Sequence, residues 1–195
     1  MHSSFLVLGL AASLAACAHK GAPSGAGSES AASSAAAREP DIDAGASGEA
    51  SAHLAPKSGN TTLSGHATFS QTGAGVKLTL HVTGAPPGEH GAHIHEKGDC
   101  SDAEAKSAGG HWNPSQHKHG APPPSSSHLG DLGNLTVAAD GTGTLELTSE
   151  SWKLGDGSPE DVVGKAVVIH GGPDDLVTDP AGNSGARIGC GVVEK

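Results

Sequence analysis

Seven histidines and one aspartate lie in the middle of the chain, and their residue types suit metal binding. Imidazole is a good ligand for copper and zinc, and a carboxylate beside imidazoles suits zinc. No cluster of cysteines offers thiolate ligands instead. We therefore predict a site for these two metals. The residues are His93, His95, His111, His117, His119, His128, Asp131 and His170, of which His117 is expected to be a bystander.

The spacing divides the candidate ligands into two groups. Side chains two positions apart on a strand face the same way, so His93 and His95 can face one ion while Ile94 faces the core. A His-x-His motif is weak evidence when it stands alone. His170, which ends the apolar run 167–169, would complete this first group.

The second group contains a carboxylate. Three imidazoles and one carboxylate are enough to close a tetrahedral zinc site without an open position, which is the structural type of site. Its members are His111, His119, His128 and Asp131.

The elements that must position these ligands are predicted to be short β-strands. From about residue 49 the sequence consists of alternating or β-branched runs broken by Gly, Pro and Asp, which is typical of an all-β sandwich or barrel. No stretch has convincing helical periodicity beyond one turn near 159–163. The predicted strands cover 50–55, 61–70, 76–83, 91–95, 134–138, 143–148, 165–170 and 188–193.

Two long polar segments interrupt the strand pattern. Residues 96–130 are rich in Gly, Ser, Pro and His, and residues 171–187 form a second Gly-rich run. Loops of this length inside a compact domain are usually functional or disordered. Bound metal could order them where packing cannot.

The N-terminal region has the composition of an export signal followed by a tether. An apolar run at 5–14 leads into Leu-Ala-Ala-Cys at 14–17, which resembles a bacterial lipobox. We expect residues 1–17 to be a lipoprotein signal peptide, Cys17 to be lipidated, and the protein to be anchored to a membrane in the periplasm or cell envelope. Only His2, and no Lys or Arg, precedes the run, so a plain apolar tail is the alternative.

The remaining chain divides at about residue 49. Residues 18–48 are rich in Ala, Ser and Gly, a composition that predicts a disordered linker, and residues 49–195 form the folded domain. Cys100 and Cys190 are an even pair in a protein expected to be exported, so we predict a disulfide, with two buried free thiols as the alternative.

The net charge of −10 excludes nucleic acid as a partner, because an acidic surface repels phosphate. An anionic substrate would need local positive charge in a cleft. The sequence leaves both a monomer and a homodimer open.

Several motifs in a fixed order resemble copper/zinc superoxide dismutase of the bacterial, exported type. They are GAHIH at 91–95, GHWNP at 110–114, KHG at 118–120, HLGDLGN at 128–134, VIH at 168–170 and GNSGARIGCG at 182–191. The resemblance covers residues 49–195. It implies an immunoglobulin-like Greek-key β-sandwich or flattened barrel of eight strands with a long metal-binding loop.

The resemblance also implies a role for each candidate ligand. The copper ligands would be His93, His95, His111 and His170, and the zinc ligands would be His111, His119, His128 and Asp131. One ring, that of His111, would therefore bridge the two ions.

Other residues match supporting positions of that family. Asp174 would link His93 to His119 from behind the ligands, and Arg187 would lie beside the open copper face. Arg187 and His111 would be the catalytic residues, superoxide would be the substrate, and Cys100–Cys190 would match the family disulfide. The loop before Arg187 is short and has Asp179 where relatives tend to carry steering lysines.

A second class of function is a non-catalytic envelope protein that binds or buffers copper and zinc. The presence of every ligand and of Arg187 favours the enzyme. The remaining histidines are expected to be structural, as for His90, or to face solvent or the sheet rim, as for His53, His66 and His81.

Overall fold

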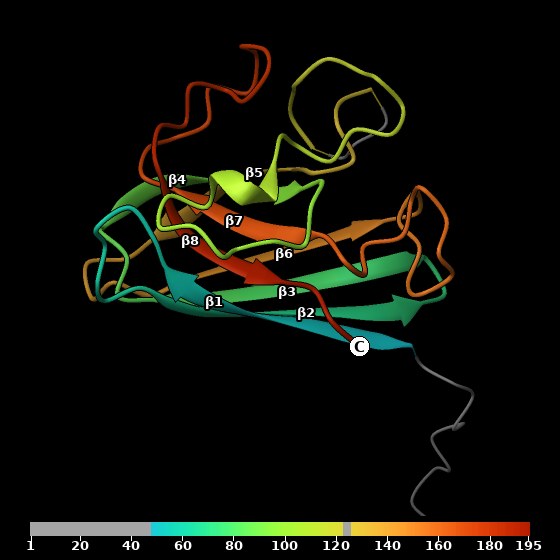
Figure 1. The fold of residues 1–195 in the computed structure, drawn as a ribbon, viewed down its shortest axis with the longest axis horizontal. Helices are drawn as coiled ribbons and strands as arrows, with labels where there is room; N and C mark the ends of the chain where they lie inside the picture. Colours follow the sequence, from blue (N-terminus) through green and yellow to red (C-terminus); the bar gives the residue numbers. More distant parts are fainter. Residues whose placement is uncertain (1–47, 123–125) are drawn as a thin grey trace, which may run out of the picture. The chain divides into compact units, whose positions relative to one another are not determined.

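The computed structural model describes residues 48–122 and 126–195, and this part of the chain folds into eight strands and one short 3-10 helix, η1 (Figure 1). The predicted signal peptide and linker lie outside the described residues. In the described part no helix is long and apolar enough to cross a membrane. The elements are β1 Glu49–Pro56, β2 Ser64–Thr72, β3 Gly75–Thr83, β4 Gly88–His95, η1 Lys106–Ala108, β5 Asp131–Val137, β6 Gly143–Ser149, β7 Ala166–His170 and β8 Arg187–Val192.

The strands form a closed antiparallel barrel in the order β1-β2-β3-β6-β5-β4-β7-β8. The strands β4, β5 and β6 are neighbours in sequence order, and β7 returns to pair with β4, which is a Greek key. Two neighbouring strand pairs share few paired residues. Strand β5 pairs with β6 only at Val137↔Gly143. Strand β1 pairs with β8 only at Ala55↔Cys190 and Pro56↔Gly189. The barrel is therefore flattened into two four-stranded sheets, as predicted.

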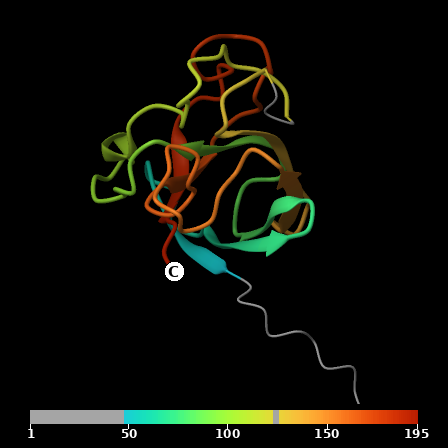
Figure 2. The same ribbon diagram turned by 90° about the vertical axis from the view of Figure 1, so that its right-hand side faces the viewer.

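The sheet that contains β4 and β7 is buried on both faces. Alternate residues such as Ile94 and Ile169 enter the barrel core, while Ala166 and Val168 pack outside it against Ala105. In contrast, β3 buries only one face and leaves Lys77, Thr79 and His81 outward, as its alternation predicts. The second face of β4 and β7 is covered because both long loops lie over it (Figures 1 and 2).

All eight predicted strands exist, and only their ends differ. The second begins at Ser64 rather than 61, because the Asn60 side chain accepts the backbone N–H of Thr62 and of Leu63 and holds a turn there. The fifth begins at Asp131 rather than 134. Its first residues lie in a Gly-rich, polar segment whose strand character arises from pairing with β4 rather than from its own composition.

The predicted disulfide joins the first long loop to β8. Cys100 and Cys190 are bonded with their Cα atoms 5.8 Å apart and 90 residues of separation. In the chain-entropy model, closing a loop of that length restricts the unfolded chain by about 4–5 kcal/mol. The bond therefore stabilises the attachment of a loop that has little apolar surface of its own.

Candidate metal centre

Four histidine rings meet over the outer face of β4 and β7. His93 and His95 come from β4, His170 ends β7, and His111 is brought in by an isolated bridge to His95. All four are buried, and one ring nitrogen from each lies within 4.8 Å of the others. We call these residues the four-histidine group.

Each ring of this group has one satisfied nitrogen and one buried nitrogen without a partner. His93 Nε2 contacts Asp174 Oδ2 at 2.7 Å, His95 Nδ1 contacts the Gly109 carbonyl at 3.0 Å, and His170 Nδ1 contacts the Gly185 carbonyl at 3.1 Å. The unpartnered atoms are His93 Nδ1, His95 Nε2, His111 Nε2 and His170 Nε2.

Buried polar atoms rarely remain unpaired, and a metal-binding histidine usually fixes its other ring nitrogen by a hydrogen bond. A single cation would satisfy all four unpartnered nitrogens, so this group fits copper, whose preferred ligand is imidazole.

The second group, which we call the carboxylate group, converges on one oxygen of Asp131. Its Oδ1 lies 2.9 Å from His111 Nδ1, 3.0 Å from His119 Nδ1 and 3.3 Å from His128 Nδ1. Ligand atoms around tetrahedral zinc are separated by about 3.3 Å, given bonds of about 2.0 Å. All four residues are buried, so this group fits a closed structural site.

The His111 ring belongs to both groups. Its Nδ1 faces the carboxylate group, while its Nε2 is one of the unpartnered atoms of the four-histidine group. Once it has lost its N–H proton, such a ring can contact two cations through opposite nitrogens.

Asp174 connects the two groups from behind. Its Oδ2 contacts His93 Nε2 at 2.7 Å and its Oδ1 contacts His119 Nε2 at 2.8 Å. The Asp174 backbone is held in turn by the Asn134 side chain, which accepts the N–H at 2.7 Å and donates to the carbonyl at 2.9 Å. Gly182 packs against the Asp174–His119 contact with φ +61°, where a side chain would collide with the carboxylate.

Burial disfavours protonation of three rings of the four-histidine group, those of His93, His95 and His170. Desolvation lowers the pKa of His93 to about 4 and of His170 to about 3, and it holds the pKa of His95 well below the ordinary range. Burial acts in the opposite sense on Asp174, but hydrogen bonds from His93, the Leu176 N–H and His119 outweigh it and lower the pKa to about 2. At neutral pH the site therefore has neutral imidazoles and an ionised carboxylate, which are the metal-binding forms.

Arg187 is fixed beside the four-histidine group by two backbone carbonyls. Its guanidinium donates to Ala105 O at 2.6 Å and to Gly109 O at 2.7 Å, and Gly109 O also contacts His95 Nδ1. The residue lines a surface cavity of about 290 Å³ together with Glu104 and Lys106. Burial lowers the pKa of Arg187 from its ordinary value, yet an arginine stays charged at neutral pH.

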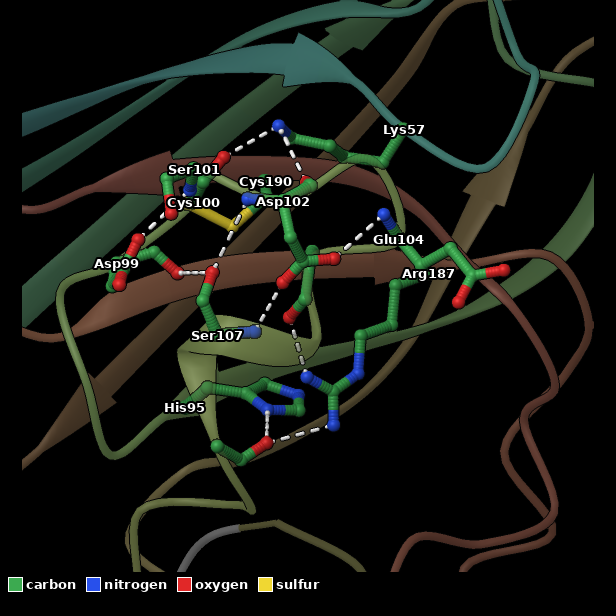
Figure 3. Close-up of a disulfide and its surroundings, with 12 residues drawn as sticks. Lys57, His95, Asp99, Cys100, Ser101, Asp102, Glu104, Ser107, Arg187 and Cys190 are labelled. Carbon is green, nitrogen blue, oxygen red and sulfur yellow. Dashed lines mark hydrogen bonds between the residues drawn. A yellow bond between two sulfur atoms is a disulfide. The ribbon is translucent and has the colours of Figure 1, made fainter.

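The loop that supplies these carbonyls is tied to the barrel near the disulfide (Figure 3). Lys57, which follows β1, donates from Nζ to Cys100 O at 2.5 Å and to Asp102 O at 3.1 Å. The Asp102 carboxylate accepts the N–H of Glu104 at 2.8 Å and that of Ser107. The lysine thus helps to place the Ala105 carbonyl that holds Arg187.

Sequence reasoning missed Lys57 and Asn134, and it named Asp179 without its contact, in which the side chain accepts the His119 N–H at 2.6 Å. Each acts across more than 35 residues of sequence, so no local motif marks it. The interpretation of the other histidines is confirmed: His90 is buried between the carbonyls of Pro86 and His170, and His117 is exposed.

Trp112, which follows His111 in the GHWNP motif, is a core residue. It is 3% exposed, and its indole N–H donates to Pro159 O at 3.0 Å.

Comparisons with known proteins place this geometry in a family. The profile described as Copper/zinc superoxide dismutase (SODC) matches residues 63–193. A curated superoxide dismutase (Cu-Zn) of Caulobacter vibrioides is 41% identical over 149 residues, which cover 74% of this chain and 86% of the relative.

Two solved structures are similar as well. A double mutant of a SOD-like protein from Bacillus subtilis has a TM-score of 0.66 at 35% identity, covering 74% of this chain and 97% of that chain. The clock protein EA4 has a TM-score of 0.67 at 36% identity, covering 76% of this chain and 94% of that chain.

A Greek-key barrel whose outer face carries two ligand groups joined by one histidine defines a two-metal β-barrel protein. The chain belongs to the copper/zinc superoxide dismutase family. It is an oxidoreductase that dismutates superoxide, and copper and zinc are its cofactors.

The lowered histidine pKa values predict that the metal-free protein loses stability in acid. Between the ordinary histidine pKa of 6.5 and the folded values of about 4 for His93 and about 3 for His170, the unfolded chain binds protons that the folded protein does not. The free energy of unfolding therefore falls as the pH falls through this window. Denaturant unfolding of the metal-free protein from pH 7.5 to 4 measures it.

Two variants separate the buried rings from histidines in general. His170→Asn should reduce the slope of stability against pH, whereas His117→Asn, at an exposed ring, should leave it unchanged. A stability that is constant from pH 7.5 to 4 contradicts the lowered pKa values.

Proposed function

We propose that the four-histidine group holds copper and that the carboxylate group holds zinc, with His111 bridging the two. The observation that carries this assignment is the set of unpartnered ring nitrogens: four buried atoms face one point, and each opposite ring nitrogen is already occupied. When bound, copper supplies alternating one-electron reduction and oxidation of superoxide, and zinc supplies fixed charge without redox chemistry.

The protein's own residues orient the ligands and supply the proton site. Asp174 fixes the rings of His93 and His119, so each presents its Nδ1 to its own group. His111 Nε2 faces the four-histidine group without a protein partner, and it is the ring atom that can hold a proton for the peroxide product. The Asp131 carboxylate keeps His111 Nδ1 oriented while that proton moves.

Arg187 is proposed to bind the superoxide anion. The chain has a formal charge of −10, so the protein as a whole repels an anion. A guanidinium held by two carbonyls at the wall of a cavity provides local positive potential at a fixed place. Asp179, in the steering segment of relatives, binds the His119 backbone and adds no positive charge, so attraction depends mainly on Arg187.

The alternative of a non-catalytic metal buffer is not favoured. A buffer needs ligands alone, whereas this chain also has a cation fixed beside the four-histidine group. The Caulobacter relative, at 41% identity, is named as the enzyme.

Removing one ligand from each group should separate the two metals. His170→Ala should abolish superoxide dismutation and copper retention while zinc remains bound, because His170 contributes to the four-histidine group only. Asp131→Asn should weaken the zinc affinity by at least about tenfold and lower the melting temperature. Loss of a residue that hydrogen-bonds to a metal ligand already lowers metal affinity by about tenfold or more, and loss of the ligand itself should cost no less. Metal analysis, melting curves and a superoxide decay assay measure these effects, with His117→Ala as the matched control.

Full activity in His170→Ala would remove this residue from the copper site. Unchanged zinc content and melting in Asp131→Asn would remove the carboxylate from the zinc site.

Substitution of Arg187 should reveal its role in attracting the anion. Arg187→Ala should lower kcat/KM by about tenfold or more and weaken its dependence on ionic strength, because local steering accounts for rate factors of about 10 to 10³. Lys77→Ala removes the same charge from the outer face of β3, in the other sheet, and should change neither quantity appreciably. A wild-type salt profile in Arg187→Ala contradicts the assignment.

We further propose that the protein is an exported lipoprotein of the periplasm or cell envelope, anchored through Cys17. The support is the lipobox-like segment at 14–17, the Ala/Ser/Gly-rich linker at 18–48 and the disulfide, a bond that persists in oxidising compartments. Cys17→Ser should move the protein from the membrane fraction to the soluble fraction and abolish incorporation of labelled fatty acid. Membrane retention with undiminished labelling in that variant would overturn the anchor.

A further inference from the structure

Three histidines form a row across β1, β2 and β3 on the outer face of the barrel. The strand register places His53 opposite His66, and His66 opposite His81. Their strand neighbours on either side, such as Leu54 and Ala67, enter the core, so the three rings share the solvent side. This sheet does not contain β4 or β7, and the row is therefore separate from the metal centre.

The first two rings of the row are in contact. The ring centroids of His53 and His66 are 4.6 Å apart with an interplanar angle of 43°. Directly opposed residues of antiparallel strands have Cβ atoms about 4.5–5.5 Å apart, a spacing from which two imidazoles can reach one ion. His53 is exposed and His66 is partly buried, so a cation can approach from solvent.

His66 has a buried ring nitrogen without a hydrogen-bond partner, as the residues of the four-histidine group do. In residues 48–122 and 126–195, five histidine ring nitrogens are buried without a hydrogen-bond partner, and four of them belong to the four-histidine group. The fifth is His66 Nδ1. An unpaired buried nitrogen is costly, and an ion beside it would remove that cost.

The third ring, His81, is turned toward the neighbouring strand β6. Its Nδ1 contacts the Thr144 hydroxyl of β6 at 2.9 Å, which leaves Nε2 as the free ligand atom. In the described residues the groups of three with ligand atoms within 4.8 Å all lie in the metal centre, so His81 joins an ion beside His66 only when its ring turns away from Thr144.

We propose that His53 and His66 form a third metal site on this face, which binds a divalent transition cation, with His81 as the third ligand. Imidazole ligands and the general order of divalent affinities favour Cu²⁺ over Ni²⁺ and Zn²⁺. The site is open to solvent and has no buried carboxylate, so it binds a cation reversibly and more weakly than the metal centre does. At this site the enzyme could bind a cation that is additional to the copper and zinc of the metal centre.

The test adds Cu²⁺ to the full-length protein already loaded with one copper and one zinc. We expect one further equivalent to bind with a dissociation constant in the micromolar range, measured by calorimetry. Electron paramagnetic resonance should show a second Cu²⁺ signal with nitrogen hyperfine structure. His53→Gln and His66→Gln should each weaken this equivalent by about tenfold or more, since each removes one of two paired ligands.

The remaining variants locate the site within the row. His81→Gln should weaken the same equivalent by a smaller factor, and His117→Gln, an exposed histidine outside the row, should leave it unchanged. His53 is exposed, so its variant tests the site even if His66→Gln fails to fold. The site is overturned if the further equivalent still binds to His53→Gln. It is also overturned if no further equivalent binds at Cu²⁺ concentrations 100-fold above the micromolar range. Unchanged affinity in His81→Gln overturns the third ligand.

Discussion

The whole functional face depends on one imidazole ring held between two ligand groups. His111 reaches Asp131 through Nδ1 and leaves Nε2 for the four-histidine group. Both nitrogens must be usable as ligands, so the ring has to be fixed in its plane, and it gives up its N–H proton when two cations bind. Two contacts meet these requirements. An isolated β-bridge to His95 positions the His111 backbone, and one carboxylate oxygen of Asp131 contacts the His111 ring together with those of His119 and His128.

Hydrophobic packing orders the loops that carry this ring at only a few points, such as Trp112 and Leu129, which join the barrel core. Residues 96–122, 126–130 and 171–186 have few other apolar side chains, and long-range polar contacts and one covalent bond hold them as well. Asp174, Asn134 and Asp179 tie the two loops to each other and to β5, while the disulfide and Lys57 tie the first loop to β8 and the end of β1. Stability and function thus use the same buried polar groups, which is why the pKa values of the site couple metal binding to folding.

Charge is arranged locally rather than over the whole molecule. An excess of acidic residues gives a negative protein, yet its ionised carboxylates Asp131 and Asp174 are buried among imidazoles, where they orient ligands. The positive charge that an anionic substrate needs is placed on the other side of the four-histidine group, at Arg187. In the described residues the guanidinium donates to two backbone carbonyls and forms no ion pair, so its charge remains available to the cavity.

The sequence alone indicated the alternation of apolar residues and two groups of candidate ligands, because both depend on local spacing and residue type. Eight strands, two ligand groups and the cysteine pair were predicted in this way. The tertiary structure decided what lies far apart in the chain: the unpartnered nitrogens, the Asn134 and Lys57 anchors, and the row His53–His66–His81. Strand register and burial create these contacts, and neither is encoded in any short segment of sequence.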